Sequence, residues 1–102
     1  AAMAEIYHIR LAPHNPKGPV ATAANIHLAA ATPNFLILEY AWPHPLFDEV
    51  QTEPMQLSNS YCGLPTRPGL GVDLDEEIIL SHPHQYRPVL YSEWDDGTPA
   101  QT

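Results

Sequence analysis

The chain has 102 residues, enough for one domain at most, and a formal net charge of −8, because 12 acidic residues outnumber the 4 Lys and Arg. This charge excludes nucleic acids and anionic membrane surfaces as partners, since both are themselves negative. No apolar run approaches the roughly 20 residues of a membrane-spanning helix. Cys62 is the only cysteine, so an internal disulfide is excluded and we expect a reducing, cytoplasmic location.

Helical and extended segments alternate in the first 40 residues. Residues 1–7 read as the last turns of a helix. Two short apolar runs, residues 9–12 and residues 35–38, follow it. Continuous apolar runs of this length are typical of strands that are buried on both faces, as in a parallel sheet.

An Ala-rich stretch, residues 20–31, separates the two predicted strands and predicts a helix, because Ala is the best helix former. Gly18 can cap this helix, and Pro19 fits its first position, where a missing N–H costs nothing. Pro33 marks its end, since the residue before a proline is disfavoured in the helical region. The segment is therefore predicted to be a βαβ unit.

Each predicted strand ends in a polar residue, His14 after the first and Glu39 after the second. Functional residues of parallel α/β folds sit at the carboxyl ends of strands. With a strand spacing of about 4.8 Å, we expect the two side chains within about 5–10 Å of each other. Such a pair could serve as a general base and a hydrogen-bonding acid. The alternative is a loop histidine beside a solvated strand end.

The second half is rich in proline, and we expect extended connections there. The prolines in residues 41–47 argue against regular structure. Residues 55–57 and 61–64 are predicted to form a hairpin, with Asn59 in the left-handed conformation of a tight turn. Residues 68–71 are expected to form a turn followed by a short strand.

Asp75 is predicted to cap the last helix, residues 76–81, whose first turn is acidic. The acids of residues 73–77 lack the ligand spacing of an EF-hand, so capping is favoured over calcium binding. His82 and His84 could chelate a metal together, but no third ligand lies nearby in sequence. We therefore interpret them as surface histidines at the end of a helix.

Three sequence blocks carry a family resemblance. The first is the P-H-x-P-x-G-P motif of residues 13–19, with Asn34-Phe35 and Glu39. The second is residues 67–76, which match P-G-L-G-[VI]-x-[VIL]-D-E, and the third runs from Tyr86 to Gly97. Together they resemble the end of an enolase-superfamily barrel of the mandelate racemase branch, and in particular acid-sugar dehydratases of the galactonate type.

The resemblance implies an α/β fold, the C-terminal fragment of a (β/α)8 TIM barrel. Residues 1–40 would be its last βαβ part, with strand seven, helix seven and strand eight. Residues 41–102 would be a C-terminal loop, hairpin and short helix that pack on the barrel and on its capping domain. Because a barrel needs about 250 residues, the remainder would be an essential partner, in this or another chain, and the complete enzyme is expected to be a homo-oligomer.

The resemblance also implies a function, that of a carbon–oxygen lyase which dehydrates a sugar acid by α-proton abstraction and enediolate stabilisation. His14 would be the acid/base at the α-carbon, and Glu39 would hydrogen-bond the substrate carboxylate. Asn15 and Trp42 are candidate substrate-binding residues, although Trp42 could instead plug the barrel top. The enzymes of this family use Mg²⁺, whose ligands are expected outside this chain.

Three alternatives remain open at this point. A racemase or epimerase of the same superfamily would use the same His14 with no leaving group. A catalytically silent truncated fragment, or an interaction module, would pair with another chain through its exposed strand edges. A metal-binding module built from the 6 histidines is the third alternative.

Overall fold

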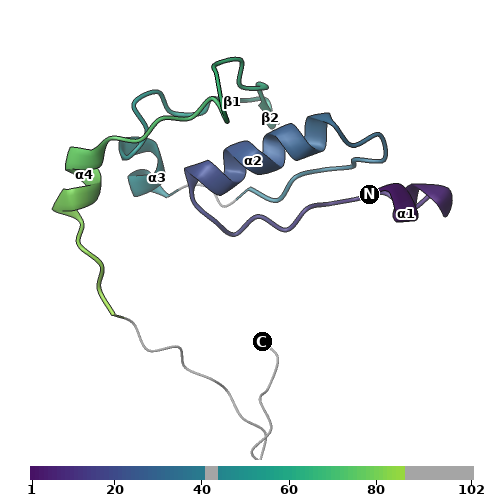
Figure 1. Ribbon diagram of the computed structural model, residues 1–102, viewed down its shortest axis with the longest axis horizontal. Helices are drawn as coiled ribbons and strands as arrows, with labels where there is room; N and C mark the ends of the chain where they lie inside the picture. Colours follow the sequence, from purple (N-terminus) through teal and green to yellow (C-terminus); the bar gives the residue numbers. More distant parts are fainter. Residues whose placement is uncertain (41–43, 87–102) are drawn as a thin grey trace, which may run out of the picture.

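The computed structural model describes residues 1–40 and 44–86. Trp42 lies outside the described residues, as do residues 87–102, which hold most of the third sequence block. The elements, in chain order, are α1 (Ala2–Ile6), α2 (Pro19–Ala30), α3 (Pro45–Glu49), β1 (Leu57–Ser58), β2 (Tyr61–Cys62) and α4 (Glu76–Ser81) (Figure 1). Within the described part, no helix has the length and apolar character that crossing a membrane requires. The cytoplasmic location stays a prediction.

Helix α1 confirms the helix expected at the start of the chain, and it ends in a backbone turn that reverses direction. The N–H of Ile9 donates to the carbonyl oxygen of Ala4, and the N–H of His8 donates to that of Glu5, both at 2.9 Å. These two bonds form a Schellman motif, in which the residue after the cap is left-handed. His8 accordingly has a φ of 56°. The turn directs the chain into the first extended segment.

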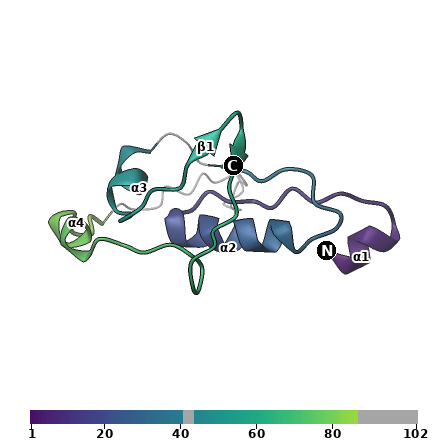
Figure 2. The same cartoon turned by 90° about the horizontal axis from the view of Figure 1, so that it is seen from above.

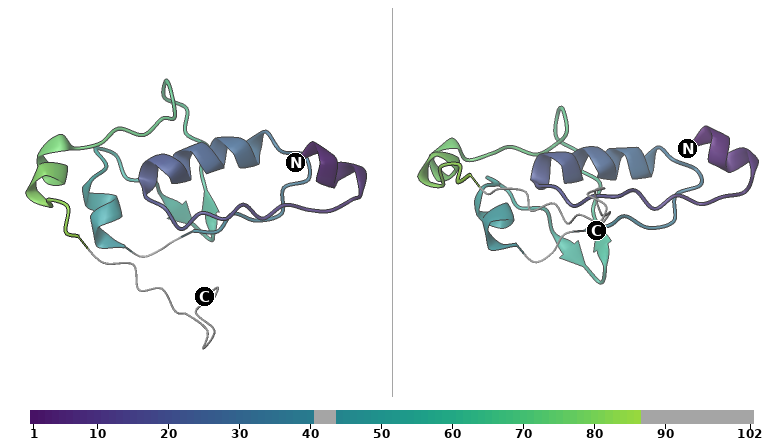
Figure 3. Two further views of the ribbon diagram at one scale, coloured as in Figure 1. Left: turned by 60° about the horizontal axis from the view of Figure 1, so that its bottom comes forward. Right: turned by 90° about the horizontal axis from the view of Figure 1, so that it is seen from below.

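Helix α2 is the central element, and it matches the prediction closely. Gly18 is its N-cap, Pro19 stands in its first turn and Ala31 is its C-cap. Its buried side chains are Thr22, Ala23 and Ile26. Figure 2 and Figure 3 show that this helix lies along the two extended segments that precede and follow it. The buried face of α2 therefore holds the only buried apolar side chains of the described residues, Ala23 and Ile26.

The two predicted strands run parallel to each other, but they share a single bridge, between Leu11 and Phe35. The N–H of Leu11 donates to the Asn34 carbonyl oxygen at 2.9 Å, and the N–H of Leu36 donates to the Leu11 carbonyl oxygen at 2.8 Å. The parallel direction agrees with the predicted βαβ unit. A longer strand ladder is not formed by these segments in the structure.

The expectation that both segments are buried on two faces is wrong for this structure. Ile9, Leu36 and Ile37 are all more than half exposed. A strand is buried on both faces only when layers cover both sides and neighbours flank both edges. Each segment here has one strand neighbour and one helix, α2, so apolar side chains that point elsewhere remain exposed.

Helix α3 corrects the prediction that residues 41–47 are irregular. Pro45 occupies the start of this helix, and His44 is its N-cap in an extended conformation. A proline at the first helical position loses no hydrogen bond, because that N–H has no partner within the helix. Pro45 therefore begins a helix instead of preventing one.

The connection between α3 and α4 lies against α2 and is held by polar contacts. Gln51 is buried, forms an antiparallel bridge with Leu74, and donates from Nε2 to the Phe47 carbonyl oxygen at 2.7 Å. His27, on α2, contacts the Leu70 carbonyl oxygen at 3.1 Å through Nε2. Residues 68–71 form the expected turn but not the short strand expected with it, and the nearest bridge is at Leu74.

The predicted hairpin is present as β1 and β2. Leu57 pairs with Cys62 and Ser58 with Tyr61 in an antiparallel register, so the turn consists of two residues. Asn59 and Ser60 have φ values of 50° and 66°. Two consecutive positive φ values are typical of a type I′ turn, whose twist matches that of the strands. The left-handed Asn59 is confirmed, and Ser60 shares its conformation.

Helix α4 begins at the predicted cap. The Oδ1 of Asp75 accepts from the N–H groups of Glu77 and Ile78 at 3.0 and 3.1 Å. His82 follows the helix as its C-cap, and its Nδ1 lies 3.0 Å from the Ile78 carbonyl oxygen. His82 and His84 are both exposed, in agreement with surface histidines at a helix end.

Gly71 is the glycine whose replacement should disturb this fold most. Gly69 and Gly71 have φ values of 68° and 71°, but a Cβ on Gly71 would overlap Pro65, whereas one on Gly69 would meet open space. We predict that Gly69→Ala costs about 1–3 kcal/mol of unfolding free energy through its φ alone, and that Gly71→Ala costs more. Urea denaturation of the two variants measures the difference, and equal costs would show that the Pro65 loop shifts freely.

Candidate functional site

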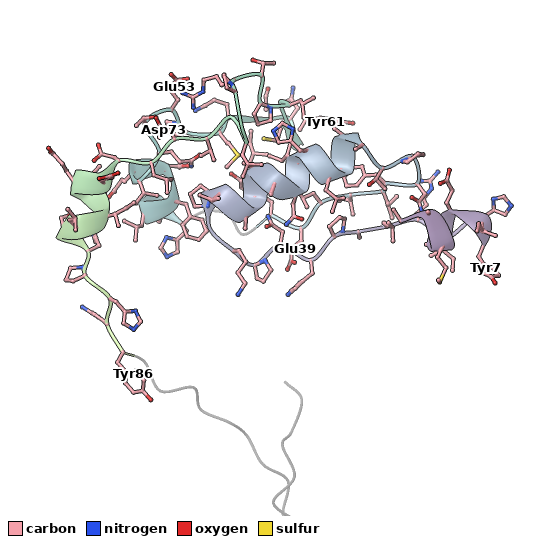
Figure 4. All side chains as sticks on the ribbon, viewed as in Figure 1. Tyr7, Glu39, Glu53, Tyr61, Asp73 and Tyr86 are labelled. Atoms are coloured by element: carbon pink, nitrogen blue, oxygen red, sulfur yellow. The ribbon has the colours of Figure 1, made fainter. Side chains whose placement is uncertain are left out.

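The structure brings His14 and Glu39 into direct contact. The Nδ1 of His14 lies 2.6 Å from the Oε2 of Glu39, with the side chains 79% and 47% exposed. The N–H of Glu39 donates to the Pro13 carbonyl oxygen at 3.3 Å, which ties together the ends of the two parallel segments. Figure 4 shows Glu39 on the side of α2 where these segments run. The pair is closer than the sequence predicted, while its catalytic role remains a proposal.

One oxygen of the Glu39 carboxylate accepts two hydrogen-bond donors. The N–H of Asn15 donates to Oε2 at 2.6 Å, in addition to the contact from His14. Among residues 1–40 and 44–86, neither Oε1 of Glu39 nor Nε2 of His14 has a hydrogen-bond partner. The pair therefore presents one carboxylate oxygen and one imidazole nitrogen to an incoming molecule.

Asn15 lies behind this pair and is fully buried. Its Nδ2 donates to the Thr22 Oγ1 at 3.0 Å and to the Glu39 carbonyl oxygen at 3.1 Å. Its Oδ1 accepts from the Nδ2 of Asn25 at 3.0 Å. The amide is thus occupied by groups of the chain itself, which favours a positioning role over the substrate contact predicted from the sequence. Direct substrate contact by Asn15 stays a prediction.

Sequence reasoning missed Thr22 and Asn25, which hold the Asn15 amide. Both lie on α2 at a spacing of three residues, and residues so spaced are neighbours on a helix surface. Two polar residues on one face of an otherwise Ala-rich helix were the signal that could have found them. Their side chains meet Asn15 because α2 packs on the segment that carries it.

His44 has a structural explanation in the described residues. Its ring stacks on that of Phe47 with the centroids 4.6 Å apart, and the residue occupies the N-cap position of α3. A Cβ on Gly18 would lie 3.9 Å from Cε1 of Phe47, so this ring lies near the start of α2.

The residues at the site do not fit a Mg²⁺ centre by themselves. Magnesium requires near-octahedral oxygen ligands, and the Oε2 of Glu39 is already bound by two nitrogen groups. Within the described ranges, no group of three His, Cys, Asp or Glu side chains is placed to hold a metal ion. Ligands for Mg²⁺ would therefore have to come from elsewhere.

The pKa values of Cys62 and Tyr40 are raised above their ordinary values. Burial raises the pKa of the Cys62 thiol. Burial also raises the pKa of the Tyr40 phenol, with smaller contributions from the negative charges of Cys62 and Asp48. A protonated thiol is a poor nucleophile, and a raised pKa favours the protonated form of Cys62.

Comparison with known proteins places this chain in a family. A family model described as Enolase C-terminal domain-like matches residues 1–78. The "D-galactonate dehydratase family member" of Streptomyces bingchenggensis is 39% identical over 93 residues, which cover 87% of this chain and 23% of that protein. The chain thus spans about a quarter of the length of the curated relatives that it matches.

Solved structures show the same relationship. A mandelate racemase/muconate lactonizing enzyme from Sulfitobacter sp. is 40% identical, with a TM-score of 0.78, over 86% of this chain and 22% of that chain. An enolase from Agrobacterium radiobacter with Na and L-malate bound is 33% identical, with a TM-score of 0.79, over 99% of this chain and 29% of that chain. The resemblance read from the three sequence blocks is confirmed, and the chain belongs to the enolase C-terminal domain-like family.

Proposed function

We propose that this chain supplies one side of the active site of an acid-sugar dehydratase. The observation that carries the proposal is the contact of 2.6 Å between His14 and Glu39 at the ends of two parallel segments. The relationship to a D-galactonate dehydratase family member supports a sugar acid as the substrate. The activity belongs to a complete protein, by which we mean these residues together with the rest of the barrel, in one polypeptide or in a companion chain.

His14 would be the acid/base group. The hydrogen on Nδ1 is donated to Glu39 Oε2 in this geometry, a tautomer inferred from the contact. The lone pair then lies on Nε2, which can take a proton from the α-carbon of a bound acid. Imidazole suits this task because its ordinary pKa lies close to neutral pH. The 79% exposure of the His14 side chain leaves room for a substrate to approach.

Glu39 would contact the substrate carboxylate through Oε1, the oxygen that Asn15 and His14 do not use. With a proton on Oε1, it donates a hydrogen bond to the carboxylate oxygen that gains charge as the α-proton leaves. The bond between the neighbouring carbon and its hydroxyl then breaks, and the hydroxyl leaves with the proton from His14 as water. The enol product converts to a 2-keto acid.

Magnesium is proposed to be bound by residues outside this chain. The described residues offer no site for it, and the family resemblance of the sequence is the ground for expecting it. When bound, the ion would supply positive charge beside the substrate carboxylate. The steps assigned to His14 and Glu39 do not pass through the ion.

The rest of the barrel is proposed as the partner that covers the exposed apolar surface of this chain. Fifteen large hydrophobic side chains are exposed in the described residues, against two buried apolar ones, Ala23 and Ile26. An open hollow of about 440 Å³ beside α2 is lined mainly by apolar side chains, including Val20, Leu70 and Leu74. Exposed apolar surface of this extent marks an interaction site.

Proton exchange at the α-carbon tests the proposed function. The complete protein is incubated in D2O with D-galactonate, its stereoisomers and its shorter homologues, and the α-hydrogen is followed by NMR. We predict exchange together with formation of a 2-keto acid for at least one of these acids, and neither for the 102-residue chain by itself. Exchange with inversion and no keto acid would identify a racemase or epimerase instead. No exchange with any acid would contradict the proposal and favour a silent interaction module.

A further inference from the structure

We propose that Asn15 is a positioning residue, which holds Glu39, and through it the ring of His14, in the geometry that proton transfer requires. This inference rests on the proposed function and adds a residue to it. Asn15 hydrogen-bonds to both the side chain and the backbone of Glu39. Its backbone N–H donates to the carboxylate Oε2 at 2.6 Å, and its side-chain Nδ2 donates to the Glu39 carbonyl oxygen at 3.1 Å.

The exposure of the three residues shows which one can determine the position of the others. The side chains of His14 and Glu39 are 79% and 47% exposed, whereas Asn15 is fully buried. A contact between exposed polar side chains is weak, because water competes for both groups and both side chains lose rotamer freedom in forming it. The pair therefore does not hold its own geometry, and the buried residue that bonds to it does.

Helix α2 fixes Asn15 in a single amide orientation. The Thr22 hydroxyl donates to the Gly18 carbonyl oxygen at 3.0 Å, so its oxygen is free to accept from Asn15 Nδ2 at 3.0 Å. On the other side, Asn25 donates to Asn15 Oδ1. A flipped amide would set Oδ1 against the Glu39 carbonyl oxygen and lose all three of these side-chain bonds. Donor and acceptor directions are consistent in only one arrangement.

The direct test is Asn15→Ala in the complete protein, with Gln51→Ala as the matched control. Gln51 is the other buried amide of the described residues, and it holds the loop after α3. We expect Asn15→Ala to lower kcat up to about 100-fold while KM changes less than about twofold, because a small misplacement of a catalytic group has effects of that size. Gln51→Ala is expected to lower the melting temperature and to leave kcat of the folded enzyme unchanged.

Substitutions at Thr22 test the same role without touching Glu39. Thr22→Val keeps the shape of the side chain and removes the hydroxyl that accepts from Asn15, so kcat should fall. Thr22→Ser keeps the hydroxyl and should restore kcat. A purely structural role would lower stability in both cases without this separation in kcat. These variants decide the question even if Asn15→Ala fails to fold.

The outcomes separate this inference from the proposed function. If His14→Gln loses α-proton exchange while Asn15→Ala and Thr22→Val keep the wild-type kcat, the positioning role is wrong and the proposed function stands. If His14→Gln keeps the wild-type rate, the proposed function itself is wrong. A lower kcat in Thr22→Val that Thr22→Ser restores is the result expected from a positioning role.

Discussion

The complete protein carrying His14→Gln should exchange the α-proton of its substrate about 100- to 10,000-fold more slowly than the wild type, the usual range for loss of a general acid/base. Glutamine is similar in size and can still reach Glu39, but it has no nitrogen that takes up a proton at neutral pH. The rate is measured from the loss of the α-hydrogen signal in D2O. Substrate binding should change much less than the rate, because Glu39 remains.

His27→Gln is the matched control for this substitution. His27 lies on α2, and its ring contacts the Leu70 carbonyl oxygen at 3.1 Å. The side-chain amide of a glutamine can also donate a hydrogen bond to this oxygen. The control should keep the wild-type exchange rate. An unchanged rate in the His14→Gln protein would show that another group moves the proton.

Ile37→Asp should lower the unfolding free energy of the complete protein by about 3–5 kcal/mol, the cost of leaving a buried charge without a partner. The side chain of Ile37 is 62% exposed in this chain and lies in an apolar run that ends at Glu39. We propose that the rest of the barrel covers it. Urea denaturation, followed by tryptophan fluorescence, measures the loss.

The same substitution in the 102-residue chain provides the comparison. Because Ile37 is largely exposed there, Ile37→Asp should change its stability by no more than about 0.5 kcal/mol. A large loss in the complete protein with a small one in the chain supports burial by the rest of the barrel. Small losses in both contexts would contradict the proposed partner surface.

Local signals allowed much of the secondary structure to be predicted. The Gly18-Pro19 pair predicted the start of α2, and Asp75 predicted the start of α4, because both act within one helical turn. Asn59 predicted the hairpin turn for the same reason, since asparagine tolerates the left-handed backbone conformation of a tight turn without help from distant residues. Pro45 was misread because a proline breaks a helix interior but starts a helix equally well.

The candidate site was predicted in part. The positions of His14 and Glu39 after two apolar runs were enough to expect them near each other, because parallel strands end at the same edge. In the structure, the backbone N–H of Asn15 donates to the same Glu39 Oε2 that His14 contacts at 2.6 Å. No pattern in the sequence distinguishes that buried asparagine from one that faces a substrate.

The sequence by itself determined the starts of α2 and α4, the hairpin turn and the closeness of His14 and Glu39, since each depends on neighbours a few residues away or on strand direction. Only the tertiary structure decided that Asn15 is buried between Glu39 and α2, and that Leu36 and Ile37 are exposed. Burial is a property of what surrounds a residue, and those surroundings come from segments distant in sequence. An apolar run indicates side chains whose burial would be favourable, and only the tertiary structure shows whether they are buried.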